Sequence, residues 1–171
     1  MKGRNAPRAR RTELAAEEPL LGSDRYHYAD AFEIRVDEPD ERPAEQLVRS
    51  SLEQAARPVG SAIWIVHRHV VRFDLGPAGS PGHVLGWRVV ESEHDAIHLE
   101  ADSPLLRAAI VVRRTEPTRA VLATYLFYKR PVAMRALWRL VGPLHRRIAP
   151  YLLQQGARRS EAALSAGSPG S

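Results

Sequence analysis

The sequence contains no cysteine, which excludes disulfide bonds, thiolate nucleophiles and cysteine-ligated zinc. It also contains no run of about 18 uncharged apolar residues, so no segment is predicted to cross a membrane. The basic N-terminal stretch lacks the continuous apolar segment of a secretory signal. These absences favour a cytoplasmic protein. With 171 residues, 44% of them hydrophobic, the chain is long enough for one domain with a core.

Lysine is nearly missing, because only two of the 25 basic residues are lysine and the rest are arginine. We interpret this bias as that of a GC-rich genome and not as a sign of phosphate recognition. The net charge is +5 over residues 1–12, −7 over 13–128 and +7 over 129–171. Nucleic-acid-binding domains usually carry their basic residues on the folded body, so this distribution argues against nucleic acid as the main partner.

The two ends of the chain lack sustained hydrophobic periodicity. Residues 1–23 mix arginine, alanine, glutamate and proline, which predicts a disordered basic arm. Residues 156–171 are mostly small and polar, which predicts a disordered tail. The sequence therefore predicts one folded domain over residues 24–155.

Hydrophobic alternation predicts an α+β domain rich in antiparallel strands. Residues 29–36 alternate as a half-buried strand, and residues 43–56 carry the apolar stripe of an amphipathic helix. Residues 60–76 contain β-branched residues, as a strand would, but their spacing favours a helix. Four further strand-like runs follow, separated by short turn-forming segments, at residues 85–89, 97–101, 106–113 and 121–127.

The last predicted element is a long amphipathic helix that begins at Pro131. Its segment LWRLVGPLHRRIAPYLL (137–153) places apolar residues on one side and arginines on the other, at about 100° per residue. His145 falls near the middle of the apolar side. Pro143 removes one helical hydrogen bond at a cost of about 3 kcal/mol, so we expect a bend near Gly142.

This order of elements resembles the START-like, or SRPBCC, superfamily, and within it an uncharacterised bacterial branch. The matching segments are YADAFEIRV (28–36), GWRVVESEHDAIHLEA (86–101) and WRLVGPLHRRIAPYLLQQGARR (138–159). The resemblance covers about residues 26–158. It implies a helix-grip fold, in which a curved antiparallel sheet wraps around the C-terminal helix and leaves an apolar cavity. The superfamily usually has more strands than the five evident here, so residues 60–73 are a candidate for the missing pair.

If such a cavity exists, the residues predicted to bind its ligand are Trp64, Trp87, Tyr125, Trp138, Val141 and His145. Each large aromatic residue is also compatible with a plain role in the core. His145 is compatible with ligand binding, with acid/base chemistry, or with a core histidine that pairs with a backbone carbonyl. Tyr125 and Tyr128 are predicted to lie on opposite faces of their strand, and Tyr125 shares a face with Phe127.

No motif predicts a metal or a cofactor. His67 and His69 form an H-x-H pair without a carboxylate at ligand spacing, so we interpret them as surface or capping histidines. The sequence also contains no glycine-rich phosphate loop, no GxSxG and no HExxH.

The first functional hypothesis is therefore a non-catalytic protein that binds an apolar or amphipathic small molecule of lipid, polyketide or isoprenoid type. The alternative is a cyclase- or dehydratase-like enzyme with His145 as acid/base and Tyr125 as carbonyl-polarising residue. A third hypothesis is an interaction module that docks through its basic ends. The arginines of the final helix and of the N-terminal arm also predict weak, salt-sensitive contact with an anionic membrane surface.

Overall fold

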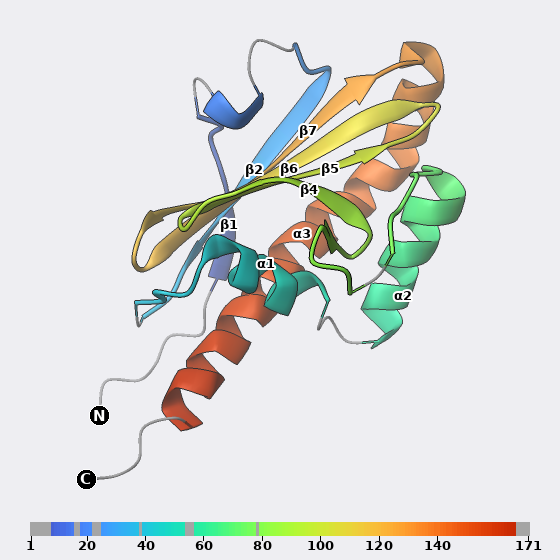
Figure 1. Cartoon of the computed structure of the whole chain (residues 1–171). Coiled ribbons are helices and arrows are strands. Elements are labelled where there is room, and N and C mark those ends of the chain that lie inside the picture. The colour runs from blue at the N-terminus through green and yellow to red at the C-terminus, as the bar shows by residue number, and fades with distance from the viewer. Residues whose placement is uncertain are drawn as a thin grey trace, which may run out of the picture.

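The structure is a computed structural model, and it describes residues 8–15, 18–21, 25–37, 39–53, 57–77 and 79–166. Its elements are β1 (Arg8–Thr12), η1 (Pro19–Leu21), β2 (Tyr28–Arg35), α1 (Ala44–Leu52), α2 (Arg57–Ile65), η2 (Val66–Val70), β3 (His83–Val84), β4 (Trp87–Ser92), β5 (Ala96–Asp102), β6 (Leu106–Glu116), β7 (Arg119–Tyr128) and α3 (Pro131–Ala166). The described residues contribute seven strands to one antiparallel sheet, which curves around α3 (Figure 1). This is the α+β helix-grip arrangement that the sequence predicted.

The strands lie in the order β1-β2-β7-β6-β5-β4-β3. After β2 the chain leaves the sheet through α1 and α2 and returns at the far edge as β3. It then adds each following strand beside the last, until β7 pairs with β2. In this register Asp30 of β2 lies opposite Thr124 of β7, and Thr124 lies opposite Ile110 of β6. Three strands thereby bring these side chains together on one face.

The two faces of the sheet carry different side chains. The inner face, toward α3, is built from large apolar residues that include Phe32, Ile34, Ile97, Leu99, Leu106 and Leu122. The outer face carries a smaller cluster that consists of Ala31, Ala109, Val111, Ala123 and Tyr125. Leu14 and Leu21 of the N-terminal segment pack against this outer cluster.

The prediction of a disordered arm over residues 1–23 is wrong for residues 8–12, which form the edge strand β1. This strand pairs with β2, so that Arg8 lies opposite Arg35 and Thr12 opposite Ala31. Its sequence, RARRT, has no apolar alternation, so the sequence did not indicate a strand. Backbone hydrogen bonds attach an edge strand to the sheet, and its side chains can therefore be polar and accessible. Residues 1–7, 16, 17 and 22–24 lie outside the described residues.

Residues 60–73 do not supply the missing pair of strands. They lie in α2 and in the π-helical turn η2, as the helical spacing favoured, and in the short segment that follows. The strands beyond the five expected runs are β1 and the two-residue β3. Both are too short or too polar to show a periodic pattern.

The prediction of a disordered tail from residue 156 is also wrong for its first residues, because α3 continues to Ala166. Gly156 lies where α3 crosses α1, and a Cβ added there would come within 1.7 Å of Ser51 Oγ. This close approach requires glycine, so Gly156 is part of the helix packing. Residues 167–171 lie outside the described residues. The helix passes through Pro143 and Pro150, and the bend near Gly142 stays a prediction.

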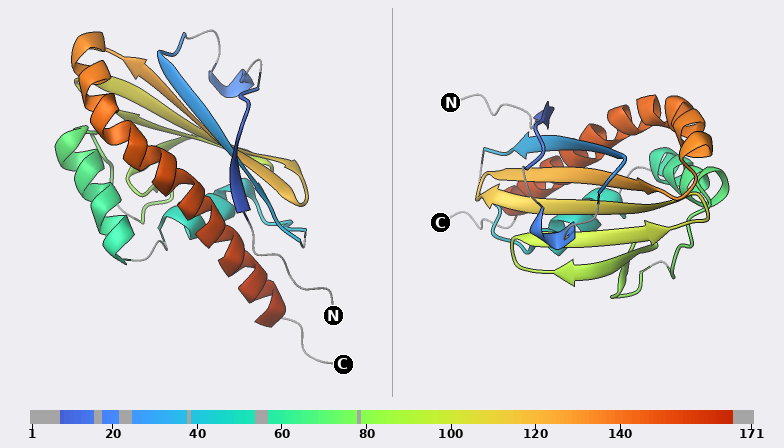
Figure 2. Two further views of the ribbon diagram at one scale, coloured as in Figure 1. Left: turned by 180° about the vertical axis from the view of Figure 1, so that it is seen from behind. Right: turned by 90° about the horizontal axis from the view of Figure 1, so that it is seen from above.

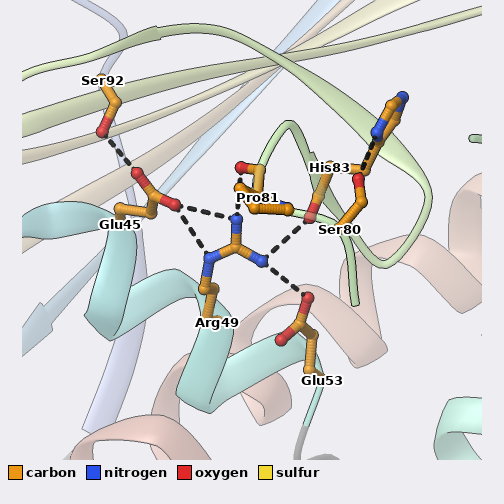
Figure 3. A network of polar contacts seen from close by, with 7 residues as sticks. All are labelled: Glu45, Arg49, Glu53, Ser80, Pro81, His83 and Ser92. Atoms are coloured by element: carbon orange, nitrogen blue, oxygen red, sulfur yellow. Dashed lines mark hydrogen bonds and ion pairs between the residues drawn. The ribbon is translucent and has the colours of Figure 1, made fainter. Parts of the chain in front are cut away.

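A polar network attaches α1 to the far edge of the sheet (Figure 3). The guanidinium of Arg49 donates to Glu45 and Glu53 on its own helix, to the carbonyl of Pro81, and to the carbonyl of His83, the first residue of β3. Ser92 of β4 donates to Glu45 at 2.8 Å. One arginine thus fixes the position of α1 relative to the strands that close the far side of the inner face.

Candidate functional site

A cavity of about 120 Å³ lies between the inner face of the sheet and α3. Its wall is almost entirely apolar and includes Val66, Leu106, Ala108, Leu122, Leu126 and Ile148. Ala62 of α2 and Leu144 of α3 line the cavity and are also exposed to solvent, so the opening lies between these two helices. Figure 2 shows α2 beside the N-terminal half of α3. An apolar cavity of this size can take a ring-sized group.

Four of the six residues predicted to bind a ligand line this cavity. Trp87 enters it from β4, and Trp138, Val141 and His145 enter it from α3. The three helix residues lie on the apolar side that the 100° rotation per residue predicted. Trp64 and Tyr125 do not line it.

Trp64 faces away from the cavity, and 44% of its surface is exposed. Its ring contacts the imidazole of His69 edge-on and lies 5.8 Å from the guanidinium carbon of Arg68. Neighbouring Ile63 faces inward with 6% exposure. The prediction was wrong because an α-helix turns about 100° per residue, and the smaller isoleucine, not the tryptophan, occupies the inner position.

Tyr125 lies on the outer face of the sheet, where its ring meets that of Tyr26 at 5.3 Å. Burial raises the pKa of its hydroxyl to about 12. It therefore cannot polarise a carbonyl in the cavity. Both faces of β7 are apolar at its centre, so alternation could not decide which face was inward. The inner positions are Leu122, Thr124 and Leu126.

A buried carboxylate holds His145 at the edge of the cavity. His145 Nε2 lies 3.2 Å from Oδ1 of Asp30, whose side chain has no exposed surface. Tyr28 donates its hydroxyl hydrogen to the other oxygen, Oδ2, at 2.6 Å. The ring of Trp138 lies against both Tyr28 and His145, with centroids 4.9 and 5.4 Å away. Packing and hydrogen bonds together fix the orientation of the imidazole.

The electrostatics of this group keep Asp30 ionised. Burial is the largest single influence and would raise the pKa of Asp30, but it is outweighed by the combined effect of the hydrogen bond to His145, the charge of that ring when protonated, the hydrogen bond from Tyr28 and the charge of Arg11. The pKa of Asp30 is therefore below its usual value. Burial, followed by the hydrogen bond to Asp30, raises the pKa of Tyr28, so Tyr28 remains a donor.

Thr124 places a hydroxyl group in the cavity wall beside this pair. The residue is 3% exposed, and its Oγ1 has no hydrogen-bond partner among the described residues. A buried polar group without a partner costs about 1–3 kcal/mol. Most buried polar groups are satisfied, so such a hydroxyl inside a cavity is a candidate ligand contact. The indole Nε1 of Trp138 likewise has no partner in the described part of the chain.

His67 enters the cavity from η2, so its interpretation as a surface or capping histidine was wrong. The indole Nε1–H of Trp87 donates to His67 Nδ1 at 3.3 Å. Burial, with a smaller contribution from the charge of His145 when that ring is protonated, lowers the pKa of His67 to about 4. His67 is therefore neutral near pH 7, and its proton lies on Nε2 because Nδ1 accepts a hydrogen bond. His69 is exposed and diverges from it, as expected on a helix.

The sequence interpretation missed Thr124 and His67 as cavity residues, and it missed Asp30 as the partner of His145. Asp30 has the same parity as Phe32 and Ile34 on β2, so the alternation already placed it on the inner face. Thr124 could have been found by the same argument once the inward face of β7 was known. The position of His67 depends on the π-helical turn, which shifts the helical register and left no pattern in the sequence.

The described residues contain no group of three or more His, Asp or Glu side chains close enough to hold a metal ion. The same residues include no helix that is both long and apolar enough to cross a membrane. The cytoplasmic location stays a prediction.

Comparisons with known proteins do not identify the chain. No family model matches it, and no curated protein matches its sequence. Among solved structures, it is similar to CalU16 from Micromonospora echinospora, with 13% identity over 91% of this chain and 93% of that chain, and a TM-score of 0.30. A similarity at this TM-score does not indicate a function.

Proposed function

We propose that this protein is a START-like ligand-binding protein that holds an apolar or amphipathic small molecule between its sheet and α3. The observation that carries the proposal is the apolar cavity of about 120 Å³, which the fold leaves open between α2 and α3. Ligand sites are typically concave and apolar with a few polar groups, and His67, Thr124 and His145 supply such groups here.

The cavity volume limits the ligand. A ring-sized molecule fits inside, and a longer lipid, polyketide or isoprenoid would place one end inside and leave the rest at the opening beside Ala62 and Leu144. Apolar burial of about 25 cal/mol per Å² would drive the binding, and the polar groups would orient the ligand.

Filling the cavity from the helix tests this proposal. Val141 lines the cavity, whereas neighbouring Leu140 is 79% exposed on the same helix. Val141→Phe should therefore weaken the binding of fluorescent apolar probes at least 10-fold, and the matched control Leu140→Phe should leave it unchanged. Native mass spectrometry of the purified protein should detect a co-purified ligand in the wild type and in Leu140→Phe only. Equal probe binding by all three proteins would contradict the proposal.

A second candidate function is acid/base catalysis in the same cavity. The ionised Asp30 beside His145 favours it, because a carboxylate that orients an imidazole is a common arrangement in general-base sites. The cyclase- or dehydratase-like activity would use His145 to remove a proton from carbon next to a carbonyl group. Tyr125 has no part in this version, since it lies on the outer face.

Proton exchange in D2O measures that step without knowledge of the natural substrate. If His145 is a base, the protein should accelerate deuterium incorporation next to the carbonyl of a bound ring ketone such as 2-tetralone, as followed by NMR. His145→Gln should abolish the acceleration while the ketone still binds. A rate equal to that of buffer, with the ketone bound, would leave only the binding function.

Exposed apolar residues on α3 favour contact with an anionic membrane. Val132, Leu140 and Leu144 are 82%, 79% and 44% exposed, and residues 131–159 contain six arginines but no acidic residue. Co-sedimentation with vesicles that contain phosphatidylserine should show binding that decreases with salt, and Leu140→Glu should reduce it. Vesicle binding that changes neither with salt nor in Leu140→Glu would contradict this membrane contact.

A further inference from the structure

We propose that the cavity recognises its ligand through a hydroxyl group, of alcohol or phenol type, placed between Thr124 and His145. The inference rests on the proposed binding function and adds the chemical class of the ligand's polar end. It is carried by two hydrogen-bonding positions in a mostly apolar wall, the hydroxyl of Thr124 on β7 and the imidazole of His145 on α3.

The first position is the free ring nitrogen of His145. Asp30 is ionised and can only accept, so Nε2 of His145 carries the proton of their hydrogen bond. Nδ1 has no partner among the described residues, and when the imidazole is neutral Nδ1 is an acceptor. A ligand group that pairs with Nδ1 in that form of the ring must donate a hydrogen.

The second position is the hydroxyl of Thr124. Thr124 lies directly opposite Asp30 in the sheet register, and Asp30 in turn contacts His145. Side chains at opposite positions have Cβ atoms about 5 Å apart, so Thr124 and His145 both flank Asp30. Oγ1 of Thr124 has no partner in the described part of the chain and is available to donate.

A hydroxyl group satisfies both positions at once, because it donates to His145 Nδ1 and accepts from Thr124 Oγ1. A carbonyl group only accepts, so it would leave the imidazole nitrogen without a partner. A carboxylate would bring a second negative charge beside buried Asp30, which carries one already. The pair of positions therefore selects an alcohol or a phenol over a ketone or an acid.

Three ring-matched probes separate these classes: naphthalene, 2-methoxynaphthalene and 2-naphthol. Naphthalene offers no oxygen, the methoxy compound only accepts, and 2-naphthol both donates and accepts. We expect the full-length protein to bind 2-naphthol about 10-fold more tightly than naphthalene in fluorescence titrations, with 2-methoxynaphthalene between them.

Two substitutions assign the preference to its residues. Thr124→Val keeps the shape and removes the hydroxyl, so it should lower the affinity for both oxygenated probes and leave naphthalene unchanged. His145→Gln keeps a donor toward Asp30 and removes the ring nitrogen, so it should abolish the advantage of 2-naphthol over 2-methoxynaphthalene. Thr115→Val, at an exposed position of β6, is the matched control and should change nothing. Circular dichroism establishes that each variant is folded.

Long-range 1H–15N NMR spectra of the histidine rings supply a readout that does not depend on affinity. The Nδ1 signal of His145 should shift on addition of 2-naphthol but not of naphthalene. Equal affinities for the three probes, or a preference that survives Thr124→Val and His145→Gln, would overturn this inference while the binding function stands. Failure of all three probes to bind would instead overturn the proposed function.

Discussion

The inner and outer faces of the sheet are built from alternate residues of the same strands, yet they are packed differently. On β7, Tyr125 faces outward and is 2% exposed, in a closed cluster with alanines of β2, β6 and β7. Thr124 faces inward and is equally buried, but it borders a cavity of about 120 Å³ and its hydroxyl has no partner among the described residues. The outer face is therefore closely packed, whereas the inner face is incompletely packed, which is the arrangement that the proposed binding function requires.

The coverings of the two faces explain this difference. A short segment with Leu14 and Leu21 covers the outer face, where small alanines let it approach closely. The inner face is covered by α2 and α3, which leave an opening between Ala62 and Leu144.

The largest expected effect is on the outer face. Tyr125→Ala removes a fully buried ring from the closed cluster and should lower the free energy of unfolding by about 3–5 kcal/mol. Leu126→Ala, the next residue, removes a side chain that already borders the cavity and should cost about 2 kcal/mol. Urea denaturation followed by circular dichroism measures both. A larger cost for Leu126→Ala would mean that the inner face is the more tightly packed.

Much of the fold could be predicted from the sequence because apolar alternation is a direct consequence of burial on one face. Strands β2 and β4 to β7 and helices α1 and α3 follow from it. Strand β1 could not be predicted, since its RARRT sequence is held by backbone hydrogen bonds that any sequence can make. The continuation of α3 was missed because Gly156 usually ends a helix, whereas here it allows contact with Ser51.

The candidate site was only half predictable for a related reason. A helix has one apolar side, so the inward position of Trp138 and His145 followed from the sequence. A strand that is apolar on both faces gives no such direction, and Tyr125 was assigned to the wrong side. The hydrogen bond between Asp30 and His145 joins residues 115 positions apart, so no local sequence pattern could predict it.

Buried histidines on the two faces should make the free energy of unfolding depend on pH, and this effect is of intermediate size. The pKa of His67 falls to about 4 in the folded state, from about 6.5 in the unfolded chain, mainly because of burial. Between pH 6.5 and 4 only the unfolded chain takes up this proton, so the free energy of unfolding should fall by about 2–3 kcal/mol as the pH is lowered through this window. Asp30, whose pKa is lowered, loses its contribution only below that window.

Chemical denaturation at several pH values measures this slope. His67→Leu should reduce it, and His69→Leu, at an exposed position two residues away, should not. Burial also lowers the pKa of His98, which lies under the N-terminal segment on the outer face, so His98→Leu should reduce the slope as well. A slope that is unchanged in His67→Leu would show that the cavity admits water to His67.

The smallest expected effect is the most direct test of the incomplete inner face. Thr124→Val replaces a buried hydroxyl without a partner by a methyl group of similar shape, so it should raise the free energy of unfolding of the ligand-free protein by about 1 kcal/mol. Thr115→Val, exposed on β6, should stay within about 0.5 kcal/mol of the wild type. If Thr124→Val makes the protein more stable and also weakens the binding of a hydroxyl-bearing probe, the hydroxyl of Thr124 serves binding and lowers stability. If Thr124→Val is instead destabilising, the hydroxyl already has a partner in solution, and the contrast between the two faces is weaker than their packing indicates.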